Sequence, residues 1–284
     1  MEGRIGRAYA NGTEYDLHTH QEAMMKLLKA FHSICEQEGL RYTLYGGSLL
    51  GAVRHNGFIP WDDDVDVLMP RKDYEQFLKI AGDLIDSDNM FLQAEFSPHW
   101  PMFFSKLRLN DTTYFERFDA KDKEMHQGIY LDIFPCDNAS DHPLIRTIQF
   151  AASRVVIAKS LYKRGYNTAG WKKQVIMQLC RLLPMRPFLA LSKLEDRTKT
   201  GHVHAFFGGT RIKSVGRGVY HRSIFNRTIP HRFEDGLFHI TTEYHHVLDA
   251  MFGDYKVLPP EEERRVTPHA AFVDARTSYK AYIA

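Results

Sequence analysis

The chain has 284 residues, 44% of them hydrophobic, which is enough for one or two domains with a buried core. Its 37 Lys and Arg residues nearly balance its 35 Asp and Glu residues, and a net charge of +2 gives no global reason to expect nucleic-acid binding. Three cysteines without a CxxC pair argue against a disulfide framework and a zinc cluster. Because no signal-peptide segment or membrane-spanning run is apparent, we expect a cytoplasmic protein.

The first predicted element is a helix over residues 19–38, where apolar side chains recur at the spacing of one helical face. Thr19 and Glu22 fit a capping box at its start, and Gly39 fits its end. A short strand over residues 42–45 is expected next.

That strand leads into Gly46-Gly47-Ser48, and a short helix over residues 49–55 would use Ser48 as its cap. Backbone N–H groups exposed at a glycine turn and at a helix start receive phosphate oxygens. By itself such a turn is a weak signal. An acidic strand close behind it makes a phosphate site much more specific.

Four aspartates, Asp62, Asp63, Asp64 and Asp66, lie within five positions. Apolar residues alternate with Asp64 and Asp66, as in a half-buried strand, so these two side chains are expected on one face. Clustered like charges need a counter-charge, and carboxylate oxygens suit a hard cation. The segment therefore predicts a site for Mg²⁺ or Mn²⁺.

A mixed order of elements follows. The pattern predicts a helix from Asp73 onward and strands near residues 91–94, 103–107 and 129–134. This order is typical of an α/β or α+β fold with a mixed sheet. We expect three parts: a core over residues 1–140, a helical subdomain over 141–200, and a C-terminal part over 201–284 that packs back on the core.

Residues 142–194 are strongly basic, with ten Lys and Arg residues and no Asp or Glu. Apolar residues recur between the charges and predict two or three basic amphipathic helices. Such helices suit an anionic membrane surface or a polyanionic acceptor, which would place the protein peripherally on the inner face of the membrane. A solvated basic face on a helical subdomain explains the pattern equally well.

Histidines close together in sequence, such as His202 with His204 and His245 with His246, lack a third ligand at a motif spacing. The sequence therefore predicts no transition-metal site at these pairs.

The stretch from Gly46 to Val67, GGSLLGAVRHNGFIPWDDDVDV, resembles the signature of the LicD family of phosphocholine transferases, which are relatives of the fukutin-related proteins. The resemblance continues with RKDY at residues 71–74, GIYLDIFP at 128–135, FGDY at 252–255 and PPEE at 259–262. It thus covers roughly residues 20 to 270, apart from the basic segment.

The resemblance implies a nucleotidyltransferase fold in which Asp64 and Asp66 hold Mg²⁺ and a third carboxylate comes from a neighbouring strand. Asp132, an acid in an otherwise apolar strand, fits that third position as a metal ligand or as the general base. By the same analogy the charge on the transferred phosphate would be stabilised by Lys106, Arg108 and Arg54. His55 is a further candidate donor contact, although Arg54 and His55 would also suit simple pairing with Asp62 or Asp63.

The resemblance implies transfer of phosphocholine from CDP-choline to a sugar hydroxyl of teichoic acid, lipopolysaccharide or a related glycan, as in members of this family, whose eukaryotic relatives use CDP-ribitol. The resemblance therefore implies a Mg²⁺-dependent transferase with a CDP-linked donor and a glycan or lipid-linked glycan acceptor. Aromatic faces would hold the quaternary ammonium group, and the candidates are Tyr45, Trp61, Trp100 and Tyr130.

Two alternatives stay open. One is a nucleotidyltransferase that acts on RNA or a small molecule, with the basic segment binding nucleic acid. The other is a non-catalytic glycan-binding protein that has kept the fold. The presence of all three acids argues against the second alternative.

Overall fold

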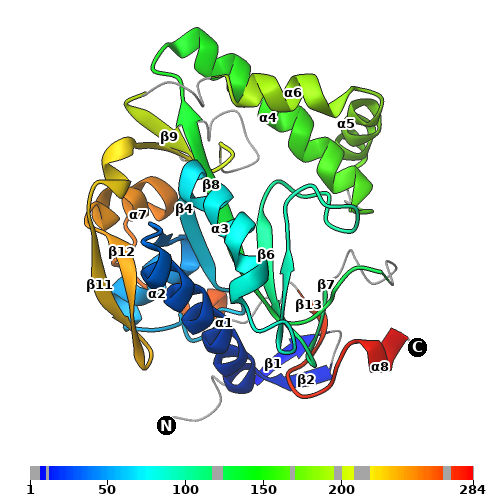
Figure 1. The fold of residues 1–284 in the computed structure, drawn as a ribbon, viewed down its shortest axis with the longest axis vertical. Helices are drawn as coiled ribbons and strands as arrows, with labels where there is room; N and C mark the ends of the chain where they lie inside the picture. The colour runs from blue at the N-terminus through cyan, green and yellow to red at the C-terminus, as the bar shows by residue number, and fades with distance from the viewer. Residues whose placement is uncertain are drawn as a thin grey trace.

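The computed structural model describes residues 7–10, 13–116, 124–166, 170–194, 200–207, 218–264 and 270–283. In these residues a curled, mixed β-sheet carries helices on its faces, and a group of helices lies at one end of the molecule (Figure 1). The fold is α+β with a mixed sheet, as the sequence predicts.

Strand β8 (Tyr130–Ala139) is the centre of the sheet. Its first part pairs in antiparallel fashion with β6 (Ser105–Leu109) and in parallel with β4 (Asp66–Pro70). Its last residues pair with β9 (His202–His204). The outer strands are β3 (Thr43–Leu44) beside β4, β5 (Met90–Gln93) beside β6, and β10 (Val219–His221) beside β9. The start of β8 therefore lies between β4 and β6.

Helices α1 (Leu17–Glu38) and α3 (Arg71–Leu84) pack on the sheet next to each other. The predicted capping box at Thr19 is wrong, because α1 begins two residues earlier. Its cap is Asp16, whose carboxylate accepts the backbone N–H groups of His18 and Thr19 at 3.0 and 3.4 Å. Gly39, with a φ of 64°, ends α1 as predicted.

Helix α2 (Gly46–His55) packs against β3, β4 and α7 (Tyr244–Phe252). A hairpin of β11 (Thr228–Phe233) and β12 (Gly236–Thr241) lies along α2 and β3. The backbone N–H of Thr241 donates to the hydroxyl of Thr43 at 2.9 Å. The C-terminal third thus contacts the central sheet and α2. The proposed division at residues 140 and 200 remains a prediction.

Several pairings lie beyond the strands that the sequence predicts. Strand β7 (Thr113–Glu116) pairs with β13 (Ala270–Asp274), and β1 (Arg7–Ala10) pairs with β2 (Thr13–Asp16). The remaining short elements are α8 (Lys280–Ile283) and the 3₁₀ turns η2 (Arg222–Phe225) and η3 (Glu261–Glu263). The β7 pairing joins residues that are far apart in the sequence, and Glu116 at the end of β7 lies 3.4 Å from Lys106 of β6.

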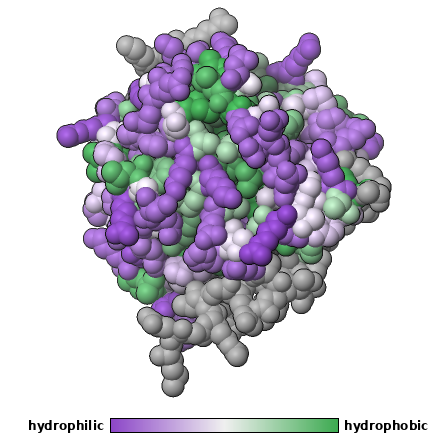
Figure 2. Space-filling model, turned by 60° about the horizontal axis from the view of Figure 1, so that its bottom comes forward, coloured by the Kyte–Doolittle hydropathy of each residue, from purple (hydrophilic) through white to green (hydrophobic). Residues whose placement is uncertain are grey.

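The basic segment forms the three helices α4 (Pro143–Lys163), α5 (Trp171–Arg181) and α6 (Met185–Ser192) at one end of the molecule (Figure 1). Among the described residues no single helix has the length and apolarity to cross a membrane. The pair α5 and α6, bent by 104°, meets that test only jointly and only by length and composition. The face drawn in Figure 2 is mostly hydrophilic, with hydrophobic side chains in small patches.

Candidate active site

Asp66 and Asp132 are neighbours on adjacent parallel strands. The register of β4 and β8 pairs their Cα atoms directly, and the register of β6 and β8 pairs Lys106 with Asp132. Side chains at paired positions emerge on the same face of a sheet. The structure thus brings three predicted site residues into one row across β4, β8 and β6, with the Lys106 Nζ atom 2.8 Å from Asp132 Oδ1.

The glycine turn lies directly against this row. A Cβ atom added at Gly46 would be 2.8 Å from Asp66 Oδ2, and one added at Gly47 would be 2.5 Å from Asp62 Oδ2. Gly46 also has a φ of +57°, a conformation that residues with a side chain rarely adopt. Glycine is therefore required here by backbone geometry and by the closeness of the carboxylates.

The prediction that Ser48 caps α2 is wrong. Helix α2 begins at Gly46 after Tyr45, so Ser48 lies within the first turn. Its hydroxyl accepts the backbone N–H of Asp66 at 2.8 Å, and the Tyr45 N–H donates to the Asp66 carbonyl at 3.0 Å. These two bonds fix the start of β4 to the N-terminal end of α2, where backbone N–H groups favour anions.

The four clustered aspartates differ in the contacts that they make. Strand β4 begins at Asp66, so Asp64 precedes the strand instead of lying in it as predicted. Asp62, Asp64 and Asp66 interact with one another, whereas Asp63 accepts a hydrogen bond from the hydroxyl of Tyr114 at 3.1 Å. We call Asp62, Asp64, Asp66 and Asp132 the acid cluster.

The acid cluster has an excess of negative charge. Burial raises the pKa of Asp66 well above its usual range, and Asp64 and Asp132 raise it further. Burial, with Asp64 and Asp63, raises the pKa of Asp62 to about 8. Burial also raises the pKa of Asp132, which Lys106 partly opposes. Crowded carboxylates of this kind, with oxygen as the only donor type, fit a hard divalent cation such as Mg²⁺ or Mn²⁺.

Lys106 and Arg108 belong to a buried network of charges around Glu116. Lys106 Nζ lies 3.4 Å from Glu116 Oε1, and Arg164 of the α4 end pairs with the other carboxylate oxygen. Burial alone would raise the pKa of Glu116, but Lys106, Arg164 and Arg108 outweigh it and lower the pKa to about 2. Sequence reasoning missed Glu116 because it reaches this network through β7, which the sequence did not predict.

Arg108 is completely buried, and its contacts are with the protein itself. Its Nε donates to Gln93 at 2.6 Å and its NH1 to the Gly128 carbonyl at 2.8 Å. These contacts indicate that Arg108 holds Lys106 and Glu116 in position. They do not favour direct contact of Arg108 with a donor. The predicted role of Arg108 in binding remains a prediction.

Two of the candidate aromatic faces are already covered by cations of the chain. Lys106 Nζ lies 3.0 Å from the ring centroid of Tyr130, and the Arg164 guanidinium lies 4.4 Å from that of Trp100. Tyr45 is buried, and its hydroxyl lies 3.0 Å from that of Tyr220. Of the four candidates, Trp61 is the one left partly exposed, with its ring near His55.

Arg54 and His55 lie at the C-terminal end of α2, opposite the glycine turn. Arg54 Nε donates to His55 Nε2 at 3.0 Å, and its NH1 donates to the carbonyl of Tyr255 at 3.0 Å. A helix of ten residues is about 15 Å long. Arg54 and His55 therefore belong to a different part of the site from Gly46, and their contact with a donor remains a prediction.

Comparison with known proteins identifies a family whose model matches part of the chain. Residues 39–164 match the family described as LicD/FKTN/FKRP, nucleotidyltransferase domain. That range contains every residue discussed above as a candidate for the donor or metal site.

Individual relatives extend the match. The chain is 29% identical over 266 residues to lipopolysaccharide cholinephosphotransferase LicD of Haemophilus influenzae, covering 89% of this chain and 95% of that protein. An uncharacterised protein of Rickettsia prowazekii is 39% identical over 181 residues, or 62% of this chain and 64% of its own length. Ribitol 5-phosphate transferase FKRP of Homo sapiens is 62% identical over 34 residues, which cover 12% of this chain and 7% of FKRP.

Proposed function

This chain is a phosphotransferase of the LicD family, and we propose that it transfers phosphocholine, or a similar substituted phosphate, from a CDP-linked donor to a hydroxyl of a cell-surface glycan precursor. The observation that carries the proposal is the contact between the acid cluster and the glycine turn. Carboxylates and a helix N-terminus at one place supply a cation site and an anion site side by side, as a diphosphate donor requires.

In this proposal the backbone N–H groups at the start of α2 bind phosphate oxygens of the donor. Asp64, Asp66 and Asp132 would hold Mg²⁺, which when bound neutralises the diphosphate. Lys106 is close enough to Asp132 to hold that carboxylate in place and to add positive charge beside the phosphate. Glu116, Arg108 and Arg164 fix the position of Lys106.

The reaction is an in-line displacement at the phosphorus that carries the choline. The acceptor oxygen forms a bond to phosphorus, the bond from phosphorus to the CMP oxygen breaks, and CMP leaves. The acceptor hydroxyl loses its proton to a carboxylate of the acid cluster. Asp132 is our candidate for this role, as the alternative to ligating the metal, because its carboxylate borders Asp66 and pairs with Lys106.

We further propose that α5 and α6 rest on an anionic membrane at the cytoplasmic face, where a lipid-linked acceptor would be found. Trp171, Ile176, Leu179 and Leu182 are 70%, 56%, 61% and 74% exposed. Lys172, Lys173 and Arg186 lie among them. Apolar side chains flanked by cations favour the interface of an anionic bilayer.

The direct test is a donor screen. Purified protein with Mg²⁺ would be given CDP-choline, CDP-ribitol, CDP-glycerol or CDP-ethanolamine, with and without a lipopolysaccharide acceptor, and CMP release would be measured. We expect acceptor-dependent release from one donor, with CDP-choline the first candidate, and loss of release with EDTA. Turnover of none of the four donors would contradict the proposal.

The control comes from the acidic run itself. Asp63→Asn keeps an oxygen that accepts the Tyr114 hydroxyl, and Asp63 is not one of the carboxylates proposed to hold the metal. We expect Asp63→Asn to retain activity and Asp64→Asn to lose it.

A further inference from the structure

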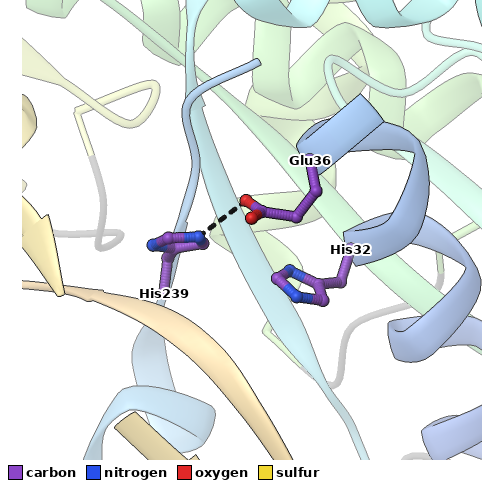
Figure 3. A group of neighbouring side chains, drawn as sticks. All are labelled: His32, Glu36 and His239. Atoms are coloured by element: carbon purple, nitrogen blue, oxygen red, sulfur yellow. Dashed lines mark hydrogen bonds and ion pairs between the residues drawn. The ribbon is translucent and has the colours of Figure 1, made fainter. Parts of the chain in front are cut away.

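A second group of potential metal ligands lies on α1 and β12, outside the acid cluster. His32 and Glu36 are one helical turn apart on α1, and His239 comes from β12 (Figure 3). One ligand atom from each residue lies within 4.8 Å of the other two. His239 Nε2 is 2.8 Å from Glu36 Oε1.

The other nitrogen of each imidazole ring faces a hydroxyl group. His32 Nδ1 lies 2.7 Å from the Tyr42 hydroxyl, and His239 Nδ1 lies 3.4 Å from the Thr228 hydroxyl. The Tyr42 hydroxyl also accepts the backbone N–H of His239 at 3.2 Å. In metal sites, ligating histidines are commonly oriented in this way, with the outer nitrogen hydrogen-bonded and the inner one bound to the ion.

Two imidazoles and one carboxylate are a ligand set for a borderline cation and not for Mg²⁺. Zn²⁺ binds histidine nitrogen at about 2.0–2.1 Å and carboxylate oxygen at about 2.0–2.2 Å. Glu36 is 56% exposed, so it has the freedom to swing from its bond with His239 to an ion, and a water molecule has access to the fourth position. We propose that His32, Glu36 and His239 bind one Zn²⁺ or a similar transition-metal ion.

Such an ion would join two distant parts of the chain. It would attach the β11–β12 hairpin to α1, and that hairpin reaches the loop before the acid cluster. Glu234, in the turn of the hairpin, accepts the backbone N–H of Phe58 at 2.8 Å, and the Glu234 N–H donates to the Asn56 carbonyl at 2.8 Å. The expected role of the ion is therefore to hold this loop in place.

The test uses the full chain, stripped with chelator and kept in excess Mg²⁺. Zinc chloride would be titrated by calorimetry, and the melting temperature would be measured with and without zinc. We expect one tight equivalent and a higher melting temperature for the wild type. In His32→Ala and Glu36→Gln the affinity for zinc should fall at least tenfold. The rise in melting temperature on adding zinc should disappear in both variants.

The matched control is His231→Ala. His231 is a half-buried histidine of the same hairpin, and its ring bonds only the neighbouring carbonyl of Arg232 among the contacts described. It should behave as the wild type. Glu36→Gln keeps a polar partner for His239, so it separates loss of the metal from collapse of the hairpin. Absence of saturable zinc binding, or equal binding by the wild type and His32→Ala, would overturn the proposal whatever the donor screen shows.

Discussion

Asp66 and Asp132 face each other from two parallel strands, with directly paired Cα atoms, and Asp132 is buried while Asp66 is half-buried. Burial raises the pKa of both carboxyl groups, Asp132 raises that of Asp66 further, and Lys106 compensates only in part. A protein that maintains such a pair without a bound cation is less stable than it would be with one carboxylate fewer.

Asp66→Asn should lower CMP release at least roughly 100-fold, since even indirect changes at metal sites cost 10- to 100-fold. In the absence of divalent metal, the same change should raise the melting temperature, because it removes a buried like-charge repulsion. Activity assays and thermal melts in EDTA check the two effects. A variant that is inactive because it is less stable would contradict the assignment.

Gly46→Ala should reduce activity at least tenfold and destabilise the protein by roughly 1–2 kcal/mol, the cost of left-handed backbone at a residue with a side chain. The added methyl group would also press on Asp66 Oδ2. Gly82→Ala is the control, because a Cβ at Gly82 of α3 meets nothing within 4 Å. It should be neutral or slightly stabilising in a denaturant titration.

Lys106→Met should destabilise the protein by roughly 3–5 kcal/mol, since it removes the cation paired with Asp132 and one of the three cations around Glu116. Chemical denaturation measures the loss. Lys29→Met removes a cation from the exposed pair with Asp235 and should change the unfolding midpoint very little. Similar losses for the two variants would show that the network around Glu116 does not depend on Lys106.

Replacing Leu179 and Leu182 together by Asp should abolish co-sedimentation with vesicles that contain anionic phospholipid. The wild type should sediment with these vesicles and much less with purely zwitterionic ones, because both apolar contact and charge contribute. Leu237→Asp, which removes a leucine that is 60% exposed on β12, should bind as the wild type does. Failure of the wild type to bind anionic vesicles would remove the membrane proposal.

Stability should fall between about pH 6.5 and pH 4 in part because of His204. Burial lowers the pKa of His204 from 6.5 to about 4, so the unfolded chain gains a proton in this window while the folded protein does not. The contribution is at most about 1.4 kcal/mol per pH unit and is absent above pH 6.5. His204→Asn should flatten the dependence of unfolding free energy on pH. An unchanged slope would show that His204 is not responsible for the pH dependence of the unfolding free energy.

The sequence by itself determined the elements whose signals are local. Apolar spacing and Gly39 placed α1 and its end, and the three helices of the basic segment follow from one amphipathic pattern. The same holds only in part for the glycine turn and the acidic run. A helix follows Tyr45 and a strand begins at Asp66, but Ser48 does not cap the helix and Asp64 precedes the strand. The sequence did not identify the cap of α1 correctly, because Asp16, and not Thr19, accepts the first backbone N–H groups of the helix.

Only the tertiary structure decided which residues meet. Asp132 lies beside Asp66 because of a strand register that spacing does not encode, and Glu116 reaches Lys106 through a strand whose partner comes from residues 270–274. His239 meets Glu36 across 203 positions of sequence. Hydrophobic patterning fixes which face of an element is buried, but the pairing of those faces depends on packing of the whole chain, and that packing creates the site.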